Sequence, residues 1–277
     1  MTLITRLSTT FTDATLPILP KDPVIPNAGA VVLYDFKNVN TWPDQTSPIT
    51  SYSSLVNNNW PTLSPTPTPA QHTYNSTSGR ITPLDTATAS FGFPVEDAST
   101  RLFADLTANY CISMWLYKPA TATGPFDTGY FARNASGTTP SNAEHSLIVR
   151  IDANQNTIQF QRPDTGFYDN SVELSAPGDA VSRVGYAWSK NNGVWQHKGI
   201  LNNGASTSYV NSTFGSSANG VKDDPTWIGR LFGSYGSASA DSALGIYRFY
   251  VENLTVSGRT AEDVWAADWA RGNGRFS

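Results

Sequence analysis

The acidic side chains are the first candidates for chemistry, because hydrolysis of a glycoside needs two carboxylates about 5 to 9.5 Å apart across the scissile bond. Two adjacent pairs of acids, Glu96 with Asp97 and Glu262 with Asp263, fall in an expected loop and at an expected helix start. Solvated or capping roles are the usual ones there. The strand segment "YVEN" offers only Glu252. We therefore expect no enzymatic activity, and Glu252 and Glu144 are the acids to replace in testing for a glycosidase.

The histidines and the cysteine give no nucleophilic or metal-binding pattern. His72, His145 and His197 stand at no metal-ligand spacing from one another or from Cys111. A catalytic triad would need a histidine beside a serine or cysteine. We expect His197 to be a packed or hydrogen-bonded strand residue, and Cys111, which has no disulfide partner, to be a buried small hydrophobic residue.

Calcium is the one cofactor that the acidic residues leave open. Ca²⁺ takes about 6 to 8 oxygen ligands, and scattered loop aspartates seldom converge on one ion. Asp223 and Asp224 are the metal candidates to inspect first, because adjacent acids before Pro225 repel each other unless something bridges them. The remaining candidate acids are Asp127, Asp152, Asp164, Asp169 and Asp241.

Composition excludes several classes of protein. Charged residues make up 14% of the 277 residues, against about 25% in typical globular domains. The net charge of −4 gives no basis for binding nucleic acid, which needs clustered Lys and Arg. No apolar run reaches the roughly 20 residues of a membrane span. Arg6 interrupts the N-terminal segment, and no apolar stretch of the length found in secretory signals follows it. We expect neither membrane insertion nor export.

The elements that would position any site are short strands. Apolar segments separated by Gly, Asn, Asp and Pro clusters follow one another from residue 89 onward, and "GAVVLYDF" (29–36) precedes them. In "YCISMWLY" (110–117) alternate residues point to opposite faces, and both faces carry bulky side chains, which indicates a central strand. "SPTPTPA" (64–70) is interpreted as a surface loop. The pattern predicts an all-β antiparallel sandwich or barrel. The other strands are expected at 89–93, 128–134, 145–152, 157–162, 182–189, 194–203, 208–214, 226–232 and 244–256.

One short C-terminal helix is expected in "GRTAEDVWAADWARGNG". Thr260 is its predicted N-cap, with Asp263 three residues on, and Gly272 is its stop. Trp265 and Trp269 share one face at i, i+4 and are the expected buried stripe.

The first 28 residues are expected to form an extended arm. Pro17, Pro20, Pro23 and Pro26 exclude a continuous helix or central strand. An arm this apolar should pack on its own domain or on a neighbouring subunit, with a disordered tail as the third alternative. We assign its apolar residues as the partner-binding set: Leu3, Ile4, Leu7, Phe11, Leu16, Ile18, Leu19, Val24 and Ile25.

The order of these segments resembles a known family. "ISMWLYKP", "FARN", "LIVRIDANQNTIQFQ", "VWQHKGILNNGASTSYVNS", "WIGR" and "ALGIYRFYVENLTVSGRTAEDVWAAD" together resemble the laminin-G-like, concanavalin A-like jelly-roll domains over Ala89 to Asp268. Ser212 departs from the glycine that usually follows Tyr-Val-Asn in that family, which alters the expected hairpin turn. The resemblance implies one antiparallel jelly-roll sandwich at 29–277, preceded by the arm at 1–28.

This fold class most readily supports carbohydrate binding. The loop aromatics that could stack on a sugar are Trp42, Trp60, Phe126, Phe167, Tyr168 and Tyr235. Each of these residues could equally belong to the core or to a subunit contact, because aromatics also dominate protein interfaces.

The opening and closing segments also resemble virion proteins of tailed bacteriophages that carry such jelly rolls. This resemblance implies a non-enzymatic structural protein of the capsid decoration, tail, baseplate or fibre. Such a protein is assembled in the host cytoplasm and held in a homo- or hetero-oligomer through its arm. A receptor module for host-surface glycan is the alternative, and a glycosidase is the third reading.

Overall fold

In the computed structural model the chain is described over residues 22–43, 45, 49–56, 64–66, 72–83, 90–92, 108–118, 131–133, 148–152, 157–161, 171–191, 194–211, 226–228 and 245–276. Antiparallel strands dominate these ranges, and helices occur only near the C-terminal end of the described part. The strands are β1 (Ala30–Asp35), β2 (Ser64–Thr66), β3 (His72–Asn75), β4 (Arg80–Pro83), β5 (Ser90–Gly92), β6 (Tyr110–Lys118), β7 (Phe131–Arg133), β8 (Ile148–Asp152), β9 (Thr157–Gln161), β10 (Ser171–Ser175), β11 (Ala180–Asn191), β12 (Val194–Leu201), β13 (Thr207–Asn211), β14 (Thr226–Ile228) and β15 (Gly245–Asn253). The helices are α1 (Leu254–Ser257) and α2 (Ala261–Gly272).

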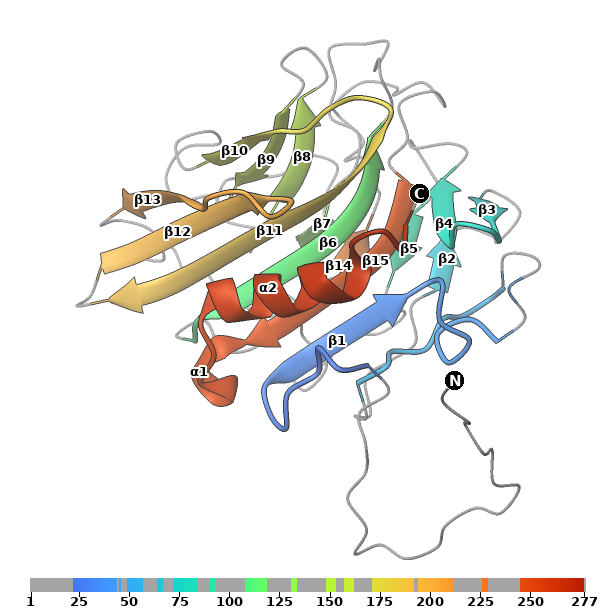
Figure 1. The fold of residues 1–277 in the computed structure, drawn as a ribbon, viewed down its shortest axis with the longest axis horizontal. Helices are drawn as coiled ribbons and strands as arrows, with labels where there is room; N and C mark the ends of the chain where they lie inside the picture. The colour runs from blue at the N-terminus through green and yellow to red at the C-terminus, as the bar shows by residue number, and fades with distance from the viewer. Residues whose placement is uncertain are drawn as a thin grey trace, which may run out of the picture.

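The largest sheet has eight strands in the order β13-β12-β11-β6-β15-β4-β3, and β1 also pairs with β15 (Figure 1). The strands β6 and β15 lie side by side at its centre. Both are buried along almost their whole length, which confirms that the segment at 110–117 is a central strand. The smaller sheets are β10-β9-β8 and β2-β5-β14-β7.

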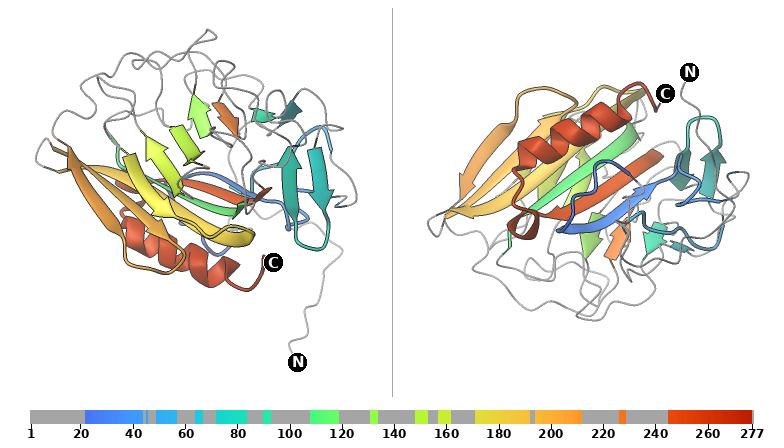
Figure 2. Two further views of the ribbon diagram at one scale, coloured as in Figure 1. Left: turned by 90° about the horizontal axis from the view of Figure 1, so that it is seen from above. Right: turned by 60° about the horizontal axis from the view of Figure 1, so that its bottom comes forward.

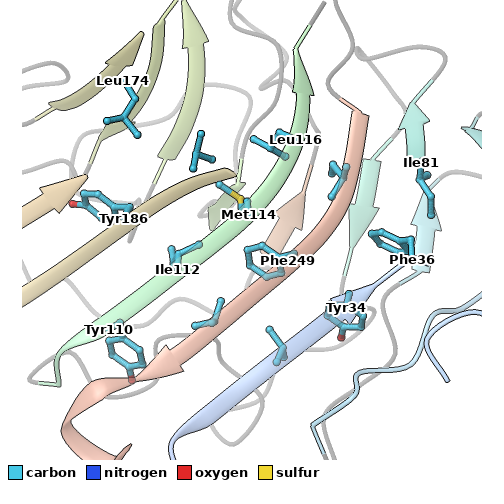
Figure 3. Packing of buried hydrophobic residues seen from close by; sticks show 14 of the residues in the cluster. Tyr34, Phe36, Ile81, Tyr110, Ile112, Met114, Leu116, Leu174, Tyr186 and Phe249 are labelled. Carbon is cyan, nitrogen blue, oxygen red and sulfur yellow. The ribbon is translucent and has the colours of Figure 1, made fainter. Parts of the chain in front are cut away.

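The large sheet forms the middle layer of the molecule. Figure 2 shows α2 on one side of it and the smaller sheets on the other. We call the side that carries α2 the outer face and the opposite side the inner face. The inner face holds the main core, in which Ile112, Met114 and Phe249 pack with Tyr34 and Leu174 (Figure 3). The alternation expected for β6 is observed, because Cys111 and Trp115 lie in separate clusters on the outer face.

The helix α2 begins where its sequence predicts, and Trp265 is buried as expected, whereas Trp269 is only partly buried. Thr260 and Asp263 form a reciprocal capping box, and the indole Nε1 of Trp265 donates to the carbonyl of Ile112 at 3.1 Å. Close approach depends on two glycines. A Cβ on Gly185 would lie 2.4 Å from Trp265 Nε1, and one on Gly272 would lie 2.4 Å from Trp115 Cε2. No helix within the described ranges is long and apolar enough to cross a membrane.

Several elements were not predicted. The strands β3, β4 and β10 and the helix α1 were not among the expected elements. Within the interpreted surface loop at 64–70, Ser64–Thr66 forms β2, which among the described strands pairs only with β5. Proline lacks an amide donor and is tolerated on such an edge strand, which is why Pro65 can occupy it.

The packed part of the chain includes residues that the sequence assigned to the arm. Asp22 is 0% exposed, and Val24 is 1% exposed and belongs to the outer-face cluster with Leu33 and Trp265. Ile25 is partly buried against the same cluster. Val24 and Ile25 therefore pack on the chain's own sandwich, which was one of the two alternatives for the arm. The other arm residues, Leu3 to Leu19, lie outside the described residues.

A buried arginine–carboxylate cluster as the candidate functional site

The outer face carries a row of polar side chains across four neighbouring strands. Asp35 of β1 stands opposite Arg248 of β15, Arg248 opposite Trp115 of β6, and Trp115 opposite Arg183 of β11. The register of β15 shifts between Ile246 and Arg248. Such a bulge re-aims side chains, so Ile246 packs in the inner core whereas Arg248 points to the outer face.

Arg248 is the centre of this cluster and is 0% exposed. Its Nε donates to Asp268 Oδ1 at 2.7 Å. Its Nη1 donates to Asp22 Oδ2 at 2.9 Å and to Asp35 Oδ2 at 2.8 Å, and its Nη2 donates to Asp22 Oδ1 at 3.1 Å. One guanidinium thus joins the segment before β1, the strand β1 and the helix α2, which come from both ends of the described chain.

Further donors complete the three carboxylates. Arg271 donates to Asp22 at 3.2 Å, and Arg275 donates to Asp35. Asp268 Oδ2 accepts from Ser113 Oγ at 2.6 Å and from Trp115 Nε1 at 2.9 Å. Buried carboxylates are tolerated only when paired and hydrogen-bonded in this way.

The electrostatics favour the charged forms of Arg248 and Asp22. Burial by itself lowers the pKa of Arg248, but the carboxylates of Asp268, Asp22 and Asp35 outweigh it and the pKa is raised. Burial likewise raises the pKa of Asp22, but the hydrogen bonds and charge of Arg248 outweigh it and the pKa is lowered. A carboxylate held ionised by bound arginines is poorly suited to exchange protons with a substrate. The role of this cluster is structural: its ion pairs hold α2 and the segment around Asp22 against the sheet.

A second ion pair lies beside the first on the outer face. Glu252 is 0% exposed, and it accepts from Arg259 Nε at 2.9 Å and from the hydroxyl of Tyr250. Burial, and then the charge of Glu252, raises the pKa of Tyr250. Arg259 also donates to the carbonyl of Val24 at 2.9 Å. Glu252, the strand acid considered for hydrolysis, is therefore buried against the segment that follows Asp22.

The histidine and cysteine expectations are met where the structure describes them. His197 is 2% exposed, and its Nδ1 lies 2.6 Å from the hydroxyl of Tyr186. Cys111 is a buried free thiol, and burial, followed by the charge of Glu252, raises the pKa of its thiol well above the ordinary value. Both residues belong to the packed interior.

The predicted glycan and metal residues lie mostly outside the described residues. Trp42 is the exception, and it is 0% exposed in the inner core, where its ring contacts Tyr52 and Tyr74. A ring enclosed in this way has no face on which a sugar can stack. Within the described ranges no three His, Cys, Asp or Glu residues gather as a metal site. The candidates outside those ranges are Trp60, Phe126, Phe167, Tyr168, Tyr235, Asp223 and Asp224.

Sequence reasoning missed the cluster itself. Asp22 lay in the expected arm, and Asp35 and Arg248 each stood in an apolar strand without a local partner. A single charge inside a hydrophobic run was the available signal, because such a charge needs a buried counter-charge. Asp268 shares a helix face with Val264 at i, i+4, beside the expected tryptophan stripe. Both Val264 and Asp268 are 0% exposed.

The chain matches no protein-family model and no curated protein. Solved structures do share its fold. A Trypanosoma rangeli sialidase is 9% identical with a TM-score of 0.57, over 91% of this chain and 34% of that one. The same sialidase in complex with sialic acid is 10% identical with a TM-score of 0.55, over 91% and 34%. The binding domain of botulinum neurotoxin serotype D is 9% identical with a TM-score of 0.56, over 89% and 51%.

This chain therefore spans about a third of the sialidase chain and half of the toxin chain. At these identities the likeness establishes the fold. The strands, their pairing and the helix-covered outer face define an all-β, concanavalin A-like jelly-roll sandwich with one short C-terminal helix. This confirms the expected fold class.

Proposed function

We propose that this chain is a glycan-binding module rather than a glycan-cleaving one. The observation that carries the proposal is the state of Glu252, which is enclosed on the outer face and bonded to Arg259. A glycosidase acid must reach the glycosidic oxygen and exchange a proton with it. Glu252 is one of the two acids whose replacement tests for a glycosidase, and its burial against Arg259 gives it a structural role.

The similarity of fold supports sugar as the ligand class. One chain of this fold is a sialidase in complex with sialic acid, and another is a neurotoxin binding domain. The composition agrees with a neutral polar ligand, because aromatic residues make up 12% of the sequence and charged residues only 14%. Aromatic rings pack on the apolar faces of sugars, and neutral polar side chains can hydrogen-bond to their hydroxyls.

The part of the outer face over β1, β15 and β6 has little free surface for such a ligand. The helix α2 covers it, and the segment around Asp22 and the arginine–carboxylate cluster fill the space beneath. We therefore propose that the sugar binds the aromatic residues predicted for loops. Trp42 is excluded from this set because it is buried. The candidates are Trp60, Phe126, Phe167, Tyr168 and Tyr235.

A glycan array with sialylated and neutral oligosaccharides tests the proposal. We expect saturable binding of at least one glycan by the full chain, and a loss of about tenfold or more when Phe167 and Tyr168 are both changed to Ala. Val39→Ala is the matched control, because Val39 is 57% exposed and belongs to no candidate set. Absence of saturable binding by folded protein, on glycans of both classes, would refute the proposal.

The glycosidase reading makes a distinct prediction. Polysaccharide turnover by the chain that disappears in Glu252→Gln or Glu144→Gln, with the fold intact by circular dichroism, would establish catalysis instead of binding alone.

A virion structural role is the second candidate, and one observation favours it. Asp22 is fixed by Arg248 and Arg271, and Val24 is buried beneath α2. Residue 22 is therefore held at a fixed place on the sandwich, and this proposal assigns the apolar residues before it as an attachment arm to other virion subunits. Light scattering of the full chain and of a variant lacking residues 1–21 tests this role. We expect the variant to fold, because Asp22 is kept, and to assemble into smaller particles. Equal assembled masses would contradict attachment through the arm.

A further inference from the structure

Arg183 is a second fully buried arginine on the outer face, and its side chain is incompletely bonded. It lies on β11 opposite Trp115 and is 0% exposed. Its Nη2 donates to the carbonyl of Asn202, and its backbone amide donates to Asn202 Oδ1 at 3.0 Å. Nε and Nη1 are buried and donate to no group in the described part of the chain.

The neighbouring carboxylate is already occupied. Asp268 Oδ1 accepts from Arg248, and Asp268 Oδ2 accepts from Ser113 and Trp115. Arg183 interacts electrostatically with the charge of Asp268, but no hydrogen bond joins the two side chains. The ring of Trp269 lies 5.9 Å from the guanidinium carbon, and such a contact leaves the in-plane N–H groups without acceptors.

The charges of the cluster balance without Arg183. Among the described residues, Asp22, Asp35 and Asp268 are matched by Arg248, Arg271 and Arg275 through direct ion pairs. Arg183 is a positive charge in excess of these pairs. Burial lowers the pKa of Arg183 to about 10, and the charge of Asp268 acts in the opposite direction. The guanidinium is therefore still charged at neutral pH.

We propose that Arg183 holds a small monovalent anion of halide size, enclosed between β11, the turn at residues 202–204 and α2. Two observations within the described part of the chain support such a ligand: buried N–H donors of Arg183 without acceptors, and a positive charge in excess of the direct ion pairs. A water molecule would accept the hydrogen bonds but would leave the charge uncompensated. The complete enclosure of Arg183 favours a small ion over a phosphate or a carboxylate ligand.

Such an ion would link α2 to β11, whereas Asp268 links α2 to β15 and β6. Arg183 and Asn202 belong to the side of the sheet where β11 meets β12. A ligand that binds only the folded state raises stability with its concentration until the site is saturated. Halide concentration should therefore set the stability of this part of the outer face.

Crystals of the full chain grown or soaked in bromide give the direct test. We expect an anomalous peak within hydrogen-bond distance of Arg183 Nε or Nη1. A water-like peak without anomalous signal, or no peak, would overturn the proposal. This measurement uses the unmodified chain and does not depend on whether a variant folds.

Thermal unfolding gives the second test. Chloride replaces gluconate at constant ionic strength, so that general screening is unchanged. We expect a saturable rise in Tm for the original chain and for Lys198→Met, and no rise for Arg183→Met. Lys198 is a suitable control because it is an outer-face cation in an exposed pair with Glu262. An equal rise in Arg183→Met would place the chloride effect elsewhere and contradict the site.

Discussion

Replacing Arg248 with Met tests the central claim that one buried guanidinium fastens both ends of the described chain to the sheet. The change removes four hydrogen bonds of 2.7 to 3.1 Å to Asp22, Asp35 and Asp268. Each charged hydrogen bond contributes about 1.5–3 kcal/mol, so the gross loss is about 6–12 kcal/mol. The net loss is smaller, because Asp22 keeps Arg271 and Asp35 keeps Arg275.

Asp268 determines most of the remaining loss. Without Arg248 it keeps only the neutral donors of Ser113 and Trp115, and leaving one partner of a buried pair costs about 3–5 kcal/mol. We expect the free energy of unfolding to fall by about 3–5 kcal/mol, which is a large part of the roughly 5–15 kcal/mol typical of a domain. Urea unfolding followed by tryptophan fluorescence measures it.

The pH dependence of the same variant separates charge from packing. In Arg248→Met the buried carboxylate of Asp268 is left without its ion-pair partner, and burial disfavours its charged form. Protonation then relieves the folded state as the pH falls. The stability difference from the original chain should therefore narrow as the pH falls.

Lys198→Met is the matched control, because its pair with Glu262 is solvent-exposed and should contribute at most about 1 kcal/mol. A loss in Arg248→Met no larger than in this control would refute the reasoning. If the stability difference between Arg248→Met and the original chain is constant across the pH range, the loss of stability comes from lost packing and not from an unpaired buried carboxylate.

Three further changes test the docking of α2 and the fastening at Asp22. Gly185→Ala should lower the free energy of unfolding by about 1–3 kcal/mol through overpacking, since the new Cβ would meet Trp265 and Ile200; a neutral result in thermal unfolding would show that α2 can shift. Thr260→Ala should lower it by about 1 kcal/mol by removing the capping box, which urea titration can resolve. Asp22 has a lowered pKa in the folded state, so its contribution is present above its unfolded pKa of about 3.9 and is lost as the pH falls through the folded value. Asp22→Asn should therefore flatten the acid side of the stability profile measured by thermal unfolding, and an unchanged slope would count against the pairing with Arg248.

Local periodicity was enough to predict the central strand, the helix and the fold class. The alternation in β6 placed Ile112 and Met114 on one face and Trp115 on the other, as observed. The N-cap at Thr260 and the burial of Trp265 followed from spacing within one helix. The strands β2, β3 and β4 were not predicted because they are only three or four residues long, which is too short to show a clear alternation.

The sequence alone determined which residues alternate, where the helix begins and that charged residues are few, because these properties depend on neighbours within a few positions. The tertiary structure decided which charges meet. Asp22 and Arg248 are 226 positions apart, and the bulge in β15 turns Arg248 toward the outer face. No local pattern encodes such a pairing, since it depends on the strand order that makes β1 and β6 both neighbours of β15 and on the helix that covers them.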